Sequence, residues 1–185
     1  MQFEKTAIEG VWIIHLQRHG DRRGYFSETF RADLFGAHIS DVTFVQDNES
    51  MSARNVVRGM HLQREPYAQA KLVRVSEGRV MDVAVDMRRG SDTFGRHISV
   101  ILDADEGTQL FIPRGFAHGF RVLSEYARFQ YKVDNIYAPQ AELSILLDDP
   151  DLGIDWGIAR EQMVLSDRDM QGITWRQAVG LLAQD

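Results

Sequence analysis

The 185 residues of this chain are enough to bury the core of one domain, and nothing in the length calls for a second. Hydrophobic residues make up 44% and charged residues 26%, as in soluble globular proteins, and no apolar run approaches the roughly 18 residues of a membrane helix. The net charge of −6 argues against nonspecific nucleic-acid binding, and the absence of cysteine excludes disulfides and thiolate metal sites.

The first elements along the chain are short. The amino terminus has no basic segment followed by an apolar stretch, so we expect no secretory signal and a cytoplasmic protein. An apolar run predicts a strand over Val11 to Leu16, and Gly20 and Gly24 mark a turn that leads into a strand from Tyr25 to Phe30. Arg31 to Ala37 is predicted to form a short helix.

Three extended segments between Phe44 and Val75 alternate apolar with polar residues. Ser40 and Asp41 are expected to begin this strand region, Ser50 to Asn55 to connect strands, and Arg64 to Gln69 to form a loop. Burying unpaired charges is costly, so the polar face must line either water or a ligand, and an exposed sheet face accounts for it as well as a site does. That polar face carries Gln46, Asn48, Arg58, His61, Gln63 and Lys71.

Further strands follow in quick succession. On the predicted strand Arg79 to Met87, the wholly apolar face is expected to lie in the core. Many short strands separated by turns predict an all-β sandwich or barrel. The other predicted strands cover Lys71 to Ser76, His97 to Leu102, Gln109 to Ile112, Arg121 to Leu123 and Tyr126 to Val133.

The carboxyl-terminal part changes character. Asp148 to Trp156 reads as a loop, and Thr174 with Gln177 fits a capping box that starts a helix at about Trp175. We therefore expect a mainly β single domain over residues 1–185, with a barrel core at about 40–147 and a helical tail at about 159–185.

Pro113, Gly115 and His118 have the spacing P-x-G-x-x-H, which resembles the second motif of the cupin β-barrel superfamily. Metal-binding cupins combine it with a first motif that contains H-x-H, whereas this chain has His61 and Gln63 at the corresponding places. Glutamine is a poor substitute for imidazole on a transition metal, so we expect a site without metal.

Many separated motifs, in the same order, resemble the dTDP-4-dehydrorhamnose 3,5-epimerase family. They are D-R-R-G-Y-F-S-E, F-V-Q-D-N, V-R-G-M-H-L-Q, Q-A-K-L-V-R-V, D-V-A-V-D-M-R, T-F-G, I-P-R-G-F-A-H-G-F, Y-K, D-D-P-D-L-G-I-D-W and L-S-D-R-D, from about Ile8 to Asp169. The resemblance implies a cupin-type jelly-roll barrel and a homodimer. It also implies epimerisation of dTDP-4-keto-6-deoxy-D-glucose at carbons 3 and 5 without a cofactor.

Inverting a carbon next to a ketone needs a base, a group that stabilises the enolate, and an acid on the opposite side. The resemblance implies that His61 is the base, that Asp169 orients it and that Tyr131 is the acid. Lys71 and His118 correspond to positions near the sugar that steady the enolate, and Asp82 is a candidate to hold either of them. Taken singly, these residues read as a structural histidine, a surface lysine and a packing tyrosine.

The resemblance also implies contacts to the dTDP portion or the neighbouring sugar. Arginine forks suit diphosphate oxygens and side-chain amides suit a pyrimidine edge, although each residue alone reads as an exposed polar group. The positions are Arg23, Glu28, Gln46, Asn48, Arg58, Glu142 and Arg168. The chain departs from the family at Leu62, Leu147 and Arg168, which leaves open the sugar and whether both carbons are inverted.

Two other functions compete with a cofactor-independent epimerase of a dTDP-4-keto-6-deoxyhexose in deoxysugar biosynthesis. One is a metal-dependent cupin oxygenase or isomerase, which bound metal required for turnover would reveal. The other is a non-catalytic nucleotide-sugar binder, but such a protein has no use for a base opposed to an acid. The expected partner is the dTDP-sugar, with no nucleic acid and no membrane.

Overall fold

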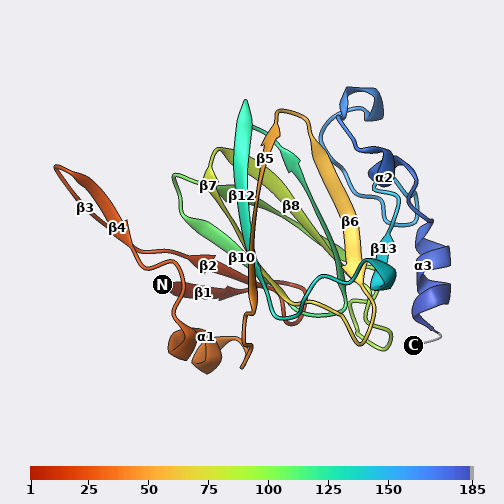
Figure 1. The fold of residues 1–185 in the computed structure, drawn as a ribbon, viewed down its shortest axis with the longest axis horizontal. Coiled ribbons are helices and arrows are strands. Elements are labelled where there is room, and N and C mark those ends of the chain that lie inside the picture. Colours follow the sequence, from red (N-terminus) through yellow and green to blue (C-terminus); the bar gives the residue numbers. More distant parts are fainter. Residues whose placement is uncertain (184–185) are drawn as a thin grey trace.

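Two antiparallel sheets that face one another dominate the computed structural model, which describes residues 1–183 (Figure 1). The six-stranded sheet has the order β1 (Gln2–Lys5), β2 (Trp12–His15), β10 (Thr108–Ile112), β7 (Lys71–Glu77), β12 (Tyr126–Val133) and β5 (Gln46–Ala53). The five-stranded sheet has the order β13 (Glu142–Ser144), β6 (Val57–Gln63), β11 (Phe116–Val122), β8 (Arg79–Asp86) and β9 (His97–Asp103).

The expected mainly β fold of cupin type is confirmed. Within residues 1–183 the strands of the body pair in two separate sheets rather than in one closed ring. The strands β1 and β2, which precede the expected barrel core, belong to the six-stranded sheet. A further pair, β3 (Arg18–Asp21) and β4 (Gly24–Ser27), forms a hairpin that projects away from both sheets (Figure 1).

Three strand predictions were wrong at their boundaries. The predicted connection from Ser50 is the second half of β5, because its polar residues lie on an edge strand that pairs continuously with β12. Ser40 and Asp41 precede β5 without forming a strand. The strand predicted to begin at Arg121 begins at Phe116, immediately after Gly115 turns the chain with a φ of 83°.

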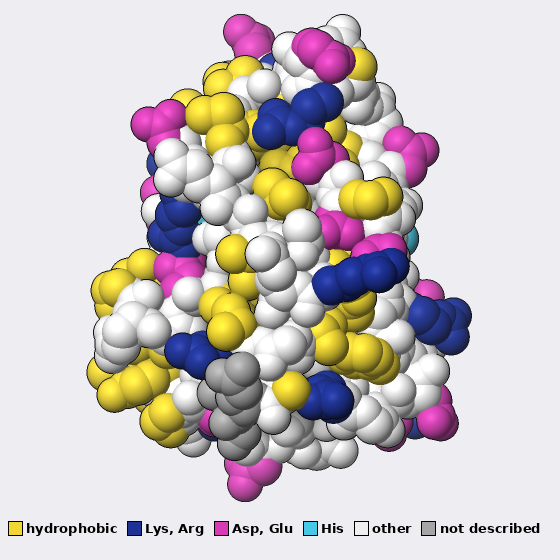
Figure 2. Space-filling view, turned by 90° about the vertical axis from the view of Figure 1, so that its right-hand side faces the viewer, with side chains coloured by type: hydrophobic (Ala, Val, Ile, Leu, Met, Phe, Trp, Pro, Cys, Tyr) yellow, Lys and Arg dark blue, Asp and Glu magenta, His cyan; other side chains and the backbone are white. Residues whose placement is uncertain are grey.

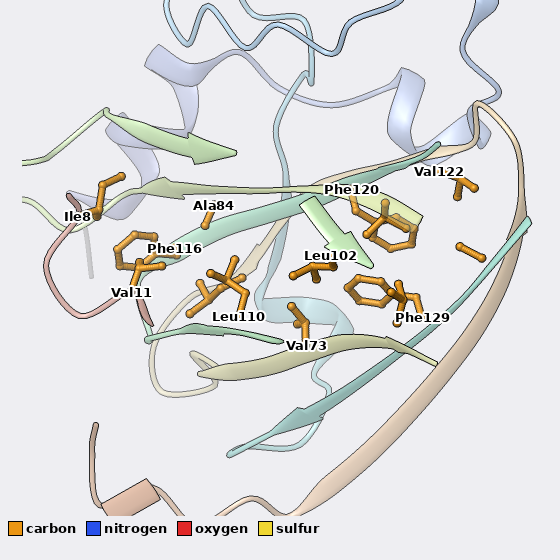
Figure 3. Close-up of a cluster of buried hydrophobic side chains, with 14 residues drawn as sticks. Ile8, Val11, Val73, Ala84, Leu102, Leu110, Phe116, Phe120, Val122 and Phe129 are labelled. Carbon is orange, nitrogen blue, oxygen red and sulfur yellow. The ribbon is translucent and has the colours of Figure 1, made fainter. Parts of the chain in front are cut away.

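The main core fills the space between the sheets (Figure 3). Val73 and Leu110 come from the six-stranded sheet, and Leu102 comes from the five-stranded sheet. Phe120 and Phe129 stack across the two sheets with ring centroids 4.1 Å apart. Burying each phenylalanine contributes about 1.5–3 kcal/mol, so this pair fixes the separation of the sheets where a cavity begins.

A second core lies on the outer face of the five-stranded sheet. Val83 and Val85 of β8 pack there against Trp156 and Ala178, as their apolar pattern predicts. The opposite face of β8 is also buried: Asp82 is 0% exposed because it points between the sheets. The covering layer contains the 3-10 helix η2 (Arg160–Gln162) and the helices α2 (Asp167–Met170) and α3 (Trp175–Leu182), whereas the 3-10 helix η1 (Pro139–Ala141) leads into the edge strand β13.

The helix α3 begins as the sequence predicts. The side chain of Thr174 accepts a hydrogen bond from the Gln177 N–H, and the Gln177 side chain accepts one from the Thr174 N–H at 2.9 Å. On the face that carries this layer, Lys and Arg side chains are interspersed with Asp, Glu and hydrophobic side chains (Figure 2). Of the helices within residues 1–183, none is long and apolar enough to cross a bilayer.

A short helix, α1 (Ala32–His38), covers part of the outer face of the six-stranded sheet. It confirms the predicted helix to within one residue. Phe35 of α1 packs against Phe111 of β10 with ring centroids 5.0 Å apart, and Phe30 and Phe44 surround it. This cluster fixes the segment from which the β3–β4 hairpin extends.

Candidate active site

A cavity of about 530 Å³ lies between the two sheets and extends to the carboxyl-terminal layer. Phe120 and Phe129 of the core form part of its wall. Ten of the twelve site residues predicted from the sequence line it: Gln46, Asn48, Arg58, His61, Lys71, His118, Tyr131, Glu142, Arg168 and Asp169. The strands, together with α2 for Arg168 and Asp169, therefore deliver these polar residues to one cavity and not to an open sheet face.

Two glycines let β6 and β11 approach closely at this cavity. Gly59 has a φ of 127°, and a Cβ atom there would lie 2.5 Å from the Cα of Gly119. Larger residues cannot occupy this crossing without moving a backbone. The register shifts between His118 and Phe120, and His61 of β6 lies opposite His118 of β11. The crossing thus brings two histidines side by side.

His61 faces a buried carboxylate. Its Nε2 lies 2.8 Å from Oδ1 of Asp169, which is 4% exposed and comes from α2. The pair is close but is not aligned as an ideal hydrogen bond, which is common for catalytic contacts before substrate binds. A proton on Nε2 that faces Asp169 leaves the lone pair on Nδ1, as a base requires.

The environment favours neutral His61 and anionic Asp169. Burial lowers the pKa of His61, and the Asp169 carboxylate only partly opposes this effect. Burial by itself would raise the pKa of Asp169, but hydrogen bonds from His61 and Ser166 outweigh it, so the pKa is lowered. His61 therefore stays unprotonated, and able to accept a proton, to lower pH than an ordinary histidine.

A second histidine–aspartate pair lies beside the first. Nε2 of His118 is 2.9 and 3.0 Å from the two carboxylate oxygens of Asp82. Asp82 is expected to hold either His118 or Lys71, and in the structure it forms a hydrogen bond with His118. Burial lowers the pKa of His118 despite Asp82, and it lowers the pKa of Lys71 to about 8, an effect that Asp82 partly offsets. Lys71 is the main cation near the pair at neutral pH.

The sheet opposite His61 carries the predicted acid. Tyr131 is on β12 and Lys71 is on β7, whereas His61 is on β6 of the facing sheet. Burial raises the pKa of Tyr131 although Arg58 opposes the shift, so its hydroxyl keeps its proton. A candidate base and a candidate acid thus stand on opposite walls of one cavity.

The rim of the cavity is polar and cross-linked. Nε of Arg58 donates to Oγ of Ser52 at 3.0 Å, and the Gln46 amide donates to Asn48 at 2.7 Å. Glu142 forms an ion pair with Arg168 and accepts a hydrogen bond from the Tyr137 hydroxyl at 2.7 Å. The two arginines place positive charge at the rim, and Glu142 opposes that of Arg168.

Sequence reasoning missed several residues of the cavity wall, among them Ser166 and Tyr137. Ser166 donates to Oδ2 of Asp169 at 2.6 Å, and the spacing Ser-x-x-Asp, a helix-start pattern, could have drawn attention to it. Tyr137 stands in the loop N-I-Y-A-P and is 48% exposed. No periodicity or motif chemistry in the single sequence distinguishes it from an ordinary loop tyrosine.

Two predicted residues lie away from the cavity within one chain. Arg23 is in the turn of the β3–β4 hairpin, where it pairs with Asp21 at 2.6 Å and leaves 83% of its side chain exposed. Glu28 follows β4 and lies 3.9 Å from Arg31. Because the hairpin projects from the body, neither side chain belongs to the wall of the cavity of its own chain.

The donor set of the cavity does not suit a metal. Gln63, which stands at the second histidine position of metal-binding cupins, donates to the carbonyls of Tyr67 at 2.7 Å and Ile136 at 3.1 Å. Its side-chain oxygen accepts from the Ala138 N–H at 2.6 Å. Residues 1–183 contain no cluster of three or more histidine, cysteine or acidic ligands. Gln63 thus holds two loops together.

The chain is similar to proteins of known activity. The family model described as dTDP-4-dehydrorhamnose 3,5-epimerase matches residues 5–177. The dTDP-4-dehydrorhamnose 3,5-epimerase of Salmonella typhimurium is 52% identical over 82% of this chain and 84% of that enzyme. The crystal structure of dTDP-6-deoxy-D-glucose-3,5-epimerase from Legionella pneumophila, in complex with dTDP-4-keto-L-rhamnose, matches with a TM-score of 0.93 and 42% identity, over 98% of this chain and 96% of that one.

A third relative has a narrower activity. ChmJ from Streptomyces bikiniensis, a 3′-monoepimerase in complex with dTDP-quinovose, matches with a TM-score of 0.86 and 33% identity, over 98% of this chain and all of that one. Single and double epimerases therefore share this fold.

Proposed function

The chain belongs to the dTDP-4-dehydrorhamnose 3,5-epimerase family and is an epimerase of that class, and we propose that it converts dTDP-4-keto-6-deoxy-D-glucose to dTDP-4-keto-L-rhamnose. Both centres that change lie next to the C4 ketone, so each inversion removes a proton that the ketone makes acidic and returns a proton to the opposite side. The enzyme serves deoxysugar biosynthesis in this proposal and uses no cofactor.

His61 removes the proton in the proposed mechanism. Its lowered pKa supports this role because the ring is neutral at physiological pH, and Asp169 stabilises the positive charge that the ring gains on protonation. The electron pair released from carbon moves to the C4 oxygen, which becomes an enolate. Histidine and aspartate thus supply base strength and orientation without a metal.

Lys71 stabilises the enolate oxygen. Its ammonium is a preformed cation in a partly buried position, where its field is stronger than in water. Neutral His118 has its N–H on Asp82 and can donate a second hydrogen bond only after gaining a proton, which burial disfavours. We therefore assign the main electrostatic role to Lys71. His118 is a substrate contact whose ring Asp82 holds.

Tyr131 returns a proton from the other wall. The observation that carries the proposal is the placement of His61 and Tyr131 on facing sheets of one cavity, because inversion requires a base and an acid on opposite sides of the same carbon. Arg58 and Arg168 suit the diphosphate, and Gln46 and Asn48 suit the pyrimidine edge.

Solvent exchange tests this function. Incubated with dTDP-4-keto-6-deoxy-D-glucose in deuterated water, the enzyme should incorporate deuterium at carbons 3 and 5 and release the L-sugar. Incorporation at one carbon would identify a monoepimerase, as in the ChmJ relative, and no incorporation would refute the proposed reaction. His15→Asn is a matched control, because His15 pairs with Glu4 outside the cavity.

We also infer a homodimer in which the β3–β4 hairpin of one copy reaches the cavity of the other. The family resemblance assigns Arg23 and Glu28 to the nucleotide, although both lie outside the cavity of their own chain. The hairpin also leaves Tyr25 61% and Phe26 70% exposed, which suits a surface that a second copy covers. A cytoplasmic location stays a prediction.

Analytical ultracentrifugation tests the dimer. Phe26→Ser should weaken association and raise the KM for the dTDP-sugar, whereas Ile101→Ser, at an exposed position of β9 that does not line the cavity, should not change the oligomeric state. A monomeric wild-type enzyme with full activity would contradict the inferred contact.

A further inference from the structure

We propose that Ser166 is a positioning residue for the His61–Asp169 pair: its hydroxyl holds one carboxylate oxygen of Asp169 so that the other faces the imidazole. The proposal rests on the proposed function, since it assigns Ser166 to the base of that reaction. Ser166 belongs to the wall of the cavity, yet its polar contacts are to Asp169.

Each oxygen of the Asp169 carboxylate has its own partners. Oδ2 accepts the Ser166 hydroxyl proton at 2.6 Å. Oδ1 lies 2.8 Å from Nε2 of His61 and accepts the Gly59 N–H at 3.4 Å. The Gly59 contact is long, so the short bond from Ser166 is the stronger restraint on rotation of the carboxylate. If the hydrogen bond from Ser166 is lost, the carboxylate can rotate and Oδ1 can turn away from His61.

The same hydroxyl also orders the backbone that carries Asp169. Ser166 is the N-cap of α2, and its Oγ accepts the Asp169 N–H at 3.2 Å while it donates to the Asp169 side chain. Main chain and carboxylate of Asp169 are thus fixed by one atom. Because α2 is only four residues long, the helix itself supplies little rigidity.

The effect of Ser166 on the pKa of His61 can be distinguished from its effect as the N-cap of α2. The Asp169 carboxylate raises the pKa of His61 against the effect of burial. If the carboxylate turns away, this support weakens and the pKa of His61 falls further below its ordinary value. A residue that only caps α2 would change thermal stability and leave that pKa where it is.

Two substitutions distinguish these roles. Ser166→Gly removes the hydroxyl but keeps most of the capping preference, because glycine is among the residues favoured at an N-cap. Ser166→Thr keeps both the hydroxyl and the cap, and the extended backbone at Ser166, with φ −79° and ψ 159°, accommodates threonine. The pair therefore separates loss of the donor from loss of the helix start.

The expected kinetic result is a loss in kcat. Ser166→Gly should lower kcat by about ten- to a hundredfold, the usual effect of removing a group that orients a functional side chain, with KM within about twofold. The acidic limb of kcat/KM should move to lower pH, and Ser166→Thr should restore both. A raised KM with unchanged kcat would show that Ser166 contacts substrate directly and would overturn the proposal.

A measurement without substrate keeps the proposal independent of the reaction. The His61 imidazole resonances, assigned by their loss in His61→Asn, report its pKa by NMR. The pKa should be lower in Ser166→Gly than in the wild type and restored in Ser166→Thr; an unchanged or higher value in the glycine variant refutes positioning. Absence of wild-type turnover would refute the proposed function alone, because the titration is read in the free enzyme.

Discussion

Replacing Lys71 by methionine should make the enzyme more stable and far less active. Burial lowers the pKa of Lys71 from 10.5 to about 8. At 1.36 kcal/mol per pH unit, this shift means that keeping the ammonium charged in the folded state costs ~3 kcal/mol. Methionine has a similar shape without the charge. Lys71→Met should therefore raise the free energy of unfolding at pH 7 by about 1–3 kcal/mol, measured by urea denaturation.

The same substitution of Lys71 should lower activity although it raises stability. If Lys71 stabilises the enolate, its removal should lower kcat by about 10²–10³, as removal of a preorganised donor does elsewhere. The wild-type kcat/KM should also fall as pH rises through about 8, since the deprotonated amine carries no charge. Tyr131 does not account for this limb, because burial raises its pKa above the ordinary value.

Lys71→Arg provides the matched variant. Guanidinium stays protonated to above pH 12, so residual activity in this variant should lack the alkaline limb near pH 8. In the wild type, stability should change with pH in the opposite direction to activity. Between pH 8 and 10.5, Lys71 is protonated in more of the unfolded chains than of the folded ones, so the free energy of unfolding rises with pH in that window. A limb near pH 8 that persists in Lys71→Arg, or a destabilised Lys71→Met, would refute the reasoning.

His61→Asn should nearly abolish deuterium exchange and leave binding of dTDP, measured by calorimetry, largely intact, because the base acts in the transition state more than on the anchored nucleotide; wild-type exchange would reject it as the base. Asp169→Asn should slow exchange through lost orientation and charge, and an equal rate would remove it from the pair. Tyr131→Phe should keep deuterium wash-in but invert poorly, whereas normal epimer yield would make Tyr131 structural. Thr174→Ala should cost about 1 kcal/mol of unfolding free energy, with Thr174→Ser as the control, unless the α3 capping box is unimportant.

Local chemistry explains why much of the fold could be predicted. Alternation identified β12 over its full length, and the capping box identified the start of α3, because both signals lie within a few neighbouring residues. Alternation failed at β5, where an edge strand carries polar residues on both faces. It also identified only one of the two buried faces of β8, since Asp82 on the other face is buried by partners that lie on other strands.

The site could be predicted only in part for a related reason. Gln46, Arg58 and His61 fall on polar strand faces, which periodicity detects, but the contact of His61 with Asp169 joins residues that only tertiary folding brings together. The family resemblance supplied that pairing. The β3–β4 hairpin shows the limit of a single chain, because the resemblance assigns Arg23 to the nucleotide and its own cavity lies elsewhere.

The departures from the family pattern differ in their consequences for specificity. Leu147 is 1% exposed in the second core, and its backbone carbonyl accepts the Trp156 indole N–H at 2.7 Å, a bond that does not depend on the side chain at Leu147. Arg168 keeps a positive charge at the rim and pairs with Glu142. Leu62 borders the cavity, but it is 4% exposed and its side chain packs in the same second core as Leu147. A difference from the family in the sugar that is accepted should therefore respond to Arg168→Lys, which restores the family residue, and be insensitive to Leu147→Trp, because only the first substitution changes a side chain at the cavity rim.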